Sequence, residues 1–241
     1  MLLLKLRQLK EIIFKKIKIT NLKIIRILKV IFSRIHLRLL SVDLKIPNWH
    51  LNATFHAREY KSKVIEIIHK FSSYDNCFIE VGCGTGDLIS RINIEKKLGI
   101  DIDKNVLSLC KRLHPQIDTI CVDIFSDFNI LKNFIENKSN KKITFVVMIN
   151  WLHMYSKTKA NLLIERILSI NNNIFVLTDI YSRPEFSIKA DNKVKHNFNH
   201  LTNVKWHLDF KNIDNVRDIN LVSNFVPEEK IIISTNKNLN M

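Results

Sequence analysis

Three glycines alternate with other residues in the stretch FIEVGCGTGD, which spans positions 78–87. They are Gly82, Gly84 and Gly86, and the chain has only one other glycine, Gly99. Because glycine has no Cβ atom, it lets a backbone turn tightly or approach a ligand closely. The flanking apolar residues predict a buried strand before the glycines and a helix over 87–93 after them. The bare amides of such a loop, together with the helix N-terminus, suit a polar ligand.

Two acidic residues flank this glycine loop. Glu80 lies two residues before Gly82, and Asp101 ends the next apolar run at positions 97–101. In a nucleotide-binding βαβ unit, a carboxylate about twenty residues after the glycines binds the ribose hydroxyls. The dinucleotide fingerprint G-x-G-x-x-G is absent, because Asp87 stands where its last glycine would be. The spacing therefore indicates a ribose-containing ligand and disfavours a dinucleotide.

The acid, the G-x-G-x-G loop and the second acid together resemble the class I S-adenosylmethionine-dependent methyltransferases. The resemblance covers roughly residues 56–235 and implies S-adenosylmethionine as the cofactor. It also implies that Glu80 orients the cofactor's ammonium group, Asp101 binds its ribose and Asp123 accepts from its adenine amino group. The residues that it places at the cofactor are Glu80, Gly82, Cys83, Gly84, Gly86, Asp101, Ile102, Asp123, Ile124 and Asn150.

Strand-like and helix-like segments alternate from residue 76 onward. Strands are predicted at 77–81, 97–101, 119–122, 143–148 and 174–177, with helices at about 87–93, 104–113, 126–137 and 157–169. This rhythm predicts an α/β fold, a doubly wound and mostly parallel sheet with helices on both faces. Segments 221–225 and 231–234 predict an antiparallel hairpin that closes the sheet, as in the family fold.

Each predicted strand end is a candidate for chemistry, because ligands bind there in such sheets. The fourth strand runs into Asn150, Trp151 and His153, and His153 is a candidate general base or a structural histidine. Trp151 and Leu152 replace the two prolines of the tetrapeptide used by methyltransferases that act on adenine or cytosine. Asp123 has a second interpretation as a local capping carboxylate, and Asp103 is expected to be the N-cap of the next helix.

The segment before the first strand mixes aromatic and polar residues, and in the family it often folds over the cofactor. Its polar residues are also compatible with an ordinary helix cap over a core of aromatics. The connection 181–200 is long and polar, which is typical of a functional loop. The candidates for lining an acceptor site are His56, Arg58, Tyr60, Trp151, Tyr181 and His196.

Residues 1–46 form a distinct basic segment, with twelve lysines and arginines against two acids. They carry +10 of the total net charge of +15. From position 23 a helical stripe appears, formed by Ile24, Leu28, Ile31, Ile35 and Leu39. Such a helix can lie on an anionic membrane surface, pack its apolar stripe on the rest of the chain, or dock a partner protein. Pro47 ends the pattern, and residues 47–241 are predicted to form the methyltransferase domain.

The composition otherwise fits a folded protein of 241 residues, with 46% hydrophobic and 25% charged residues. The four cysteines form no C-x-x-C pair, so that no metal site is expected. We expect the cysteines to be free thiols in a reducing cytoplasm. Lysines and arginines interrupt the first turns, which argues against a signal peptide. No uncharged stretch approaches the length of a membrane span.

These observations predict a methyltransferase that acts by in-line transfer on a small-molecule, saccharide or lipid-linked acceptor. A small acceptor is favoured over nucleic acid, because most of the positive charge lies in residues 1–46 beside an apolar stripe. The alternatives are an RNA methyltransferase, favoured by the net charge, and a non-catalytic adaptor that keeps a cofactor-binding fold. The expected location is cytoplasmic, with peripheral membrane contact through residues 1–46.

Overall fold

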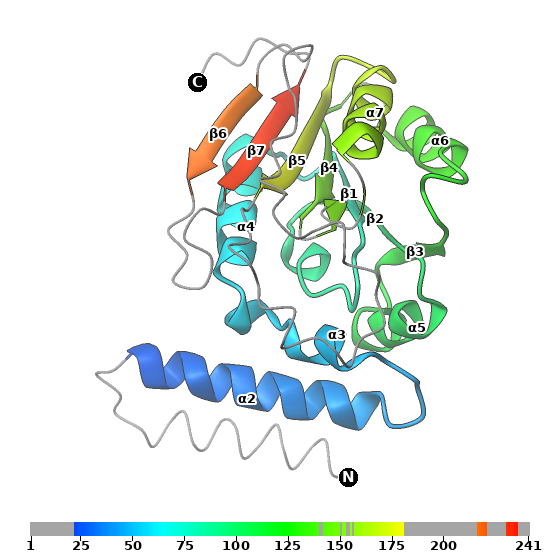
Figure 1. Ribbon diagram of the computed structural model, residues 1–241. Helices are drawn as coiled ribbons and strands as arrows, with labels where there is room; N and C mark the ends of the chain where they lie inside the picture. Colours follow the sequence, from blue (N-terminus) through cyan, green and yellow to red (C-terminus); the bar gives the residue numbers. More distant parts are fainter. Residues whose placement is uncertain are drawn as a thin grey trace.

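A seven-stranded sheet forms the centre of the protein in a computed structural model that describes residues 22–139, 142–149, 151, 152, 155, 157–180, 216–220 and 230–235 (Figure 1). The strand order is β3-β2-β1-β4-β5-β7-β6. Strands β1 to β5 run parallel, and β7 is antiparallel to both β5 and β6. The strands are β1 (Cys77–Val81), β2 (Lys96–Asp101), β3 (Asp118–Cys121), β4 (Thr144–Met148), β5 (Ile174–Ile180), β6 (Val216–Asn220) and β7 (Lys230–Thr235).

Helices cover both faces of this sheet (Figure 1). The helical elements are α2 (Leu22–Leu40), α3 (Asn48–Asn52), the 3-10 turn η1 (Phe55–Ala57), α4 (Glu59–Phe71), the 3-10 turn η2 (Ile89–Arg91), α5 (Lys104–Leu113), α6 (Asn129–Lys138) and α7 (Lys157–Leu168). Alternate residues of each central strand feed two separate cores. In β1, Ile79 and Val81 pack with α6 and α7, whereas Phe78 packs with α4. Burial of both faces explains why these strands are continuously apolar instead of alternating.

The strand order reverses between β1 and β4. From β1 the chain proceeds outward to β2 and β3, and it then returns to place β4 on the other side of β1. Loops that leave β1 and β4 in opposite directions open a crevice at the carboxyl edge of a parallel sheet, where ligands bind in such folds. The glycine loop follows β1 directly, so that it lies at this switch point.

The predicted fold class is confirmed, and one predicted element needs correction. The closing antiparallel pair is formed by β7 with β6 at Val216–Asn220, whereas 221–225, the segment predicted as its first strand, lies outside the described residues. The helix predicted over 87–93 is wrong, because only the 3-10 turn η2 forms there. Its apolar residues Leu88, Ile89 and Ile92 are buried as expected, but a helix this short has little stability of its own and packing decides its shape.

Helix α2 lies along η1 and α3 (Figure 1), and the residues that contact them lie outside its predicted apolar stripe. Leu37 packs against Leu51 of α3 and Leu109 of α5. Arg26 Nε donates to the carbonyl of His56 at 3.0 Å, and Arg34 Nη2 donates to that of Asn52 at 3.2 Å. The interpretation that the predicted stripe packs on the domain is therefore wrong for its exposed members Ile24, Ile31 and Ile35.

Candidate functional site

The glycine loop turns back sharply onto β2. Gly82, Gly84 and Gly86 all have left-handed backbones, with φ values of 73°, 56° and 74°. The amides of Gly82 and Cys83 both donate to the carbonyl of Ile100, at 2.8 and 3.0 Å. A side chain at any of these glycines would be strained by the positive φ. The three glycines are therefore required by the path of the loop itself.

Asp101 joins the end of β2 to this loop. Its Oδ2 accepts from the Gly84 amide at 2.9 Å, and its Oδ1 accepts from the Asp103 amide at 3.0 Å. Burial raises the pKa of Asp101, and the two amides oppose that shift. Asp103 is the N-cap of α5, as predicted, because its Oδ1 accepts from the amides of Asn105 and Val106. Asp101 thus holds the glycine loop at the carboxyl end of β2.

Glu80 lies on the other side of the loop, inside the protein. Its Oε2 accepts from the Ile89 amide at 2.9 Å. Burial raises the pKa of Glu80 to about 8, and the nearby Lys61 ammonium opposes the shift. A carboxyl group in this position keeps its proton at neutral pH until a cation approaches it. Glu80 therefore has the character of a site that can receive a positive charge.

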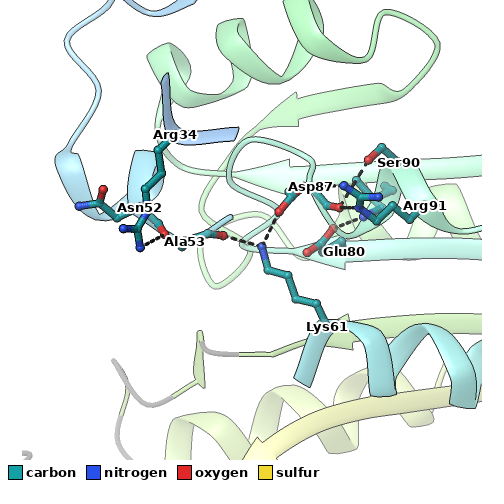
Figure 2. Close-up of polar contacts among 9 residues, drawn as sticks. Arg34, Asn52, Ala53, Lys61, Glu80, Asp87, Ser90 and Arg91 are labelled. Carbon is teal, nitrogen blue, oxygen red and sulfur yellow. Dashed lines mark hydrogen bonds and ion pairs between the residues drawn. The ribbon is translucent and has the colours of Figure 1, made fainter. Parts of the chain in front are cut away.

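Lys61 connects three parts of the site (Figure 2). It extends from α4, and its Nζ donates to the Ala53 carbonyl at 2.7 Å and to Asp87 Oδ2 at 3.1 Å. Asp87 also pairs with Arg91, whose Nη2 lies 3.5 Å from Asp87 Oδ1. The side chain of Lys61 is buried, and a buried ammonium is stable only when it is paired and hydrogen-bonded. Lys61 thereby ties the segment before β1 to the end of the glycine loop.

Two rings lie directly on the backbone of the glycine loop. A Cβ atom added to Gly84 would lie 3.2 Å from His50 Nδ1, and one added to Gly82 would collide with Trp151 Cδ1 and Cγ. His50 comes from α3 and is buried, which lowers its pKa to about 4. It is therefore a neutral imidazole at physiological pH. The loop thus approaches its neighbours as closely as only glycine permits.

Aromatic side chains continue from Trp151 along the carboxyl edge. The ring centroid of Phe125 lies 5.8 Å from that of Trp151 and 4.4 Å from that of Tyr155. Burial raises the pKa of Tyr155 to about 12, and the charges of Asp123 and Asp101 add to the shift. Ile102, just beyond Asp101, is 69% exposed. This edge combines apolar rings with carboxylates, which is the composition of a site for a flat, hydrogen-bonding ligand.

The structure brings most of the predicted cofactor residues together. Glu80, the loop with Cys83, and Asp101 lie at one crevice edge, as described above. Asp123 uses its Oδ1 to accept from the Phe125 amide at 3.0 Å, which is the capping role considered for it. Ile124 is 1% exposed and packs in the core beside α6, so that only its backbone could contact a ligand. Four predicted site residues lie outside the described part of the chain: Asn150, His153, Tyr181 and His196.

The segment before β1 reaches the loop with residues other than the predicted ones. Tyr60 packs on the core beneath α4, His56 lies in η1 and Arg58 is exposed. The residues of this segment that contact the loop are His50 and Lys61. Neither stands in a recognisable motif, and the sequence contains no signal for them beyond the polar character of a buried segment. Among the described residues, no cluster of His, Cys, Asp and Glu could hold a metal ion.

We expect Lys61→Met to lower the free energy of unfolding by about 1–3 kcal/mol, because it leaves the Ala53 carbonyl and Asp87 without their buried donor. Urea unfolding followed by circular dichroism measures this change. Lys63→Met is the matched control, since Lys63 pairs with Glu66 at the surface of the same helix and should change the free energy by less than about 0.5 kcal/mol. Equal effects of the two substitutions would show that Lys61 does not hold the loop.

Comparison with known proteins places this geometry among methyltransferase folds. The magnesium protoporphyrin IX methyltransferase ChlM of Synechocystis, solved with bound SAM, has a TM-score of 0.51 at 13% identity over 86% of this chain and 91% of its own. A SAM-dependent methyltransferase of Anabaena variabilis has a TM-score of 0.54 at 11% identity, over 73% of this chain and 83% of its own. The chain has the fold of the S-adenosylmethionine-dependent methyltransferases.

A third methyltransferase of this fold was solved with a cofactor product. The N-methyltransferase NodS of Bradyrhizobium japonicum, in complex with S-adenosyl-L-homocysteine, has a TM-score of 0.52 at 11% identity over 83% of this chain and 98% of its own. No protein-family model matches the sequence, and no curated protein matches it. At such low identities the likeness concerns the fold, and the activity must be argued from the site.

Proposed function

We propose that this protein is an S-adenosylmethionine-dependent methyltransferase. The observation that carries the proposal is the pairing of Asp101 with the glycine loop, in which Asp101 Oδ2 accepts from the Gly84 amide at 2.9 Å. This contact brings the Asp101 carboxylate, which would bind the ribose, to the glycine loop, and the buried acid Glu80 lies on the strand that leads into the same loop. Solved proteins of this fold hold SAM or S-adenosyl-L-homocysteine, which supports the same cofactor here.

The residues present fit this cofactor. The carboxylates of Glu80 and Asp101 are the acceptors that an ammonium group and two ribose hydroxyls require, and the rings of Trp151 and His50 lie against Gly82 and Gly84 beside them. Bound S-adenosylmethionine supplies a methyl group already activated on a sulfonium. Glu80 would bind the ammonium group, Asp101 would accept from the ribose hydroxyls through lone pairs left by its two amides, and Ile102 would cover the adenine. These residues hold the donor in position, which is the main contribution that an in-line displacement needs.

The proposed acceptor is a small molecule, a saccharide or a lipid-linked group. The named acceptor of ChlM is a porphyrin, and Trp151, Phe125 and Tyr155 offer comparable apolar surface beside the loop. A general base is required only if the acceptor must lose a proton, as a hydroxyl group does. His50 is a poor candidate for such a base, because burial lowers its pKa to about 4.

Calorimetry with S-adenosylmethionine, S-adenosyl-L-homocysteine and NAD tests the cofactor. We expect the first two to bind and NAD not to bind, and binding of NAD alone would overturn the proposal. Incubation of the protein with radiolabelled cofactor and a fractionated cell extract then tests the acceptor. Label in the small-molecule or lipid fraction is the expected result. Label in RNA would favour the alternative suggested by the net charge, and cofactor binding without any transfer would favour a non-catalytic adaptor.

Asp101→Ala should weaken the binding of S-adenosylmethionine by about 1–3 kcal/mol, because the ribose hydroxyls lose a charged acceptor. It should also lower the stability of the apo protein by a similar amount, since Gly84 and Asp103 lose the acceptor of their amides. Calorimetry and urea unfolding measure the two effects. Asp118→Ala, which removes an exposed acid from the start of β3, is the control, and unchanged affinity in Asp101→Ala would remove the assignment.

A further inference from the structure

The outward side of α2 carries a stripe of exposed isoleucines. Ile24, Ile27, Ile31 and Ile35 are 39–50% exposed, and their spacing of three and four residues places them on one face of the helix. Exposed apolar residues are ordinary when they are scattered, but a continuous stripe marks a surface that contacts something. We call these four residues the isoleucine stripe.

Residues of α2 outside the isoleucine stripe contact the rest of the protein. Leu37 packs on α3 and α5, and Arg26 and Arg34 donate to backbone carbonyls of the segment that follows. At the end of the helix, Arg112 of α5 donates to the Leu40 carbonyl and pairs with both oxygens of Asp43. The orientation of α2 is therefore set by polar contacts that turn the isoleucine stripe away from the protein.

The charge around the isoleucine stripe is positive. Helix α2 contains five lysines and arginines and no acidic residue, and its Arg38 is exposed. Asp43, the acid that follows the helix, is neutralised by Arg112. An apolar helical face bordered by basic residues is the composition that binds at the interface of an anionic bilayer. No helix among the described residues is long and apolar enough to span a membrane.

Residues 1–21 and a second copy of α2 are two other candidates to cover the isoleucine stripe. Both fit its positive surroundings less well than an anionic membrane does. Residues 1–21 carry six lysines and arginines against one acid, and they would place like charge against α2. A second copy of α2 would bring a second exposed Arg38 to the contact. Repulsion between like charges opposes both arrangements, whereas anionic headgroups attract Arg38 and the basic residues of 1–21.

We propose that the isoleucine stripe of α2 is the surface by which this protein binds an anionic membrane. Helix α2 lies against α3, whose His50 contacts the glycine loop (Figure 1). The membrane would then lie at the end of the molecule that carries the glycine loop, one layer of structure away from it. Vesicle binding requires no cofactor, so that its outcome is independent of the proposed methyl transfer.

Co-sedimentation of the full-length protein with vesicles tests the proposal. The vesicles are made of phosphatidylcholine alone or of phosphatidylcholine mixed with phosphatidylglycerol. We expect the wild type to sediment with the mixed vesicles only. Replacing Ile27, Ile31 and Ile35 together by glutamine should lower the partition coefficient about a hundredfold, at about fivefold for each side chain. Arg38→Gln should lower it about fivefold and should reduce its dependence on salt.

Leu162→Gln is the matched control, since Leu162 is 54% exposed on α7, at the far end of the molecule from α2 (Figure 1). It should leave the partition coefficient unchanged. The proposal fails if the wild type stays in the supernatant or if the triple variant binds as the wild type does. It also fails if the triple variant melts at a much lower temperature without lipid, which would show that residues 1–21 cover the stripe. A lower molecular mass of that variant in light scattering would instead assign the stripe to a second copy.

Discussion

Gly86→Ala should lower the free energy of unfolding by about 2–5 kcal/mol, through two separate effects. Alanine at a left-handed backbone position, here with φ of 74°, costs roughly 1–2 kcal/mol. The new Cβ atom would also lie 2.5 Å from Cys110 Sγ and 3.1 Å from His114 Cδ2. Cys110 is fully buried in α5, so that overpacking adds about 1–3 kcal/mol. Urea unfolding measures the sum.

A second substitution separates the two effects. In the Gly86→Ala background, Cys110→Ala removes the sulfur that the new methyl group would strike, and a double-mutant cycle should show a favourable coupling of about 1–3 kcal/mol. Gly84→Ala is the matched control, because its φ is also positive but its Cβ atom would meet only His50, at 3.2 Å. It should lose only the roughly 1–2 kcal/mol of backbone strain. Purely additive effects of Gly86→Ala and Cys110→Ala would contradict the packing described here.

Gly86→Ala should also weaken binding of S-adenosylmethionine at least about tenfold. The Gly86 amide donates to the Cys83 carbonyl at 3.0 Å and closes the turn. A shift of Gly86 would move the Gly84 amide away from Asp101. Because positioning depends on fractions of an ångström, a small displacement of the loop costs considerable affinity. Calorimetry at a temperature where the variant remains folded measures this loss.

Glu80→Gln should stabilise the apo protein at pH 8 and weaken cofactor binding. The pKa of Glu80 is raised from 4.5 to about 8 in the folded state. Between these values the unfolded chain releases the proton while the folded protein keeps it, so that the free energy of unfolding falls as the pH rises. Each unit of pKa corresponds to about 1.4 kcal/mol, and the wild type should lose several kcal/mol across this window through Glu80. Glutamine keeps the carbonyl that accepts from Ile89 and does not titrate.

Urea unfolding of wild type and Glu80→Gln at pH 5 and pH 8 tests the stability effect. The advantage of the variant should be small at pH 5 and large at pH 8. Glu66→Gln, at a surface position of α4, should show no such difference. A Glu80→Gln variant that is less stable than the wild type at pH 8 would mean that Glu80 is ionised in the folded apo protein.

Calorimetry tests the binding effect of the same substitution. Loss of the carboxylate should weaken S-adenosylmethionine by about 1–3 kcal/mol, since hydrogen bonds to charged groups contribute that much. In the wild type near neutral pH, the cofactor's ammonium group should draw out the proton of Glu80. The measured enthalpy should then depend on the ionisation enthalpy of the buffer for the wild type, and less so for the variant. Equal dependence in both proteins would show that Glu80 does not meet the ammonium group.

The sequence by itself was sufficient for the sheet and for the contact between Asp101 and the glycine loop. The five parallel strands are short apolar runs, and each is decided by burial of its own side chains. The glycine loop and Asp101 lie within about twenty residues of one another, so that the spacing alone indicates their proximity. The antiparallel pair that closes the sheet was also predicted, and the structure forms it from β6 and β7.

Only the tertiary structure decided what covers the glycine loop. His50, Lys61 and Trp151 reach it from α3, from α4 and from the end of β4, and no local pattern relates these positions. The turn at Ile89–Arg91 likewise replaced a predicted helix, because Leu88, Ile89 and Ile92 are held by the core around them. Short elements have little intrinsic stability, and their conformation follows from the contacts that the rest of the chain supplies.

The orientation of α2 shows most clearly what the sequence predicts and what only the tertiary structure decides. Its periodic isoleucines and leucines predicted the helix and a stripe, but they did not determine which side faces the domain. Arg26 and Arg34 find backbone carbonyls there, and Leu37 finds the small cluster with Leu51 and Leu109. Periodicity records which side chains share a face of a helix. The partner of that face depends on hydrogen-bond acceptors and apolar surface contributed by distant segments, which only the folded chain brings together.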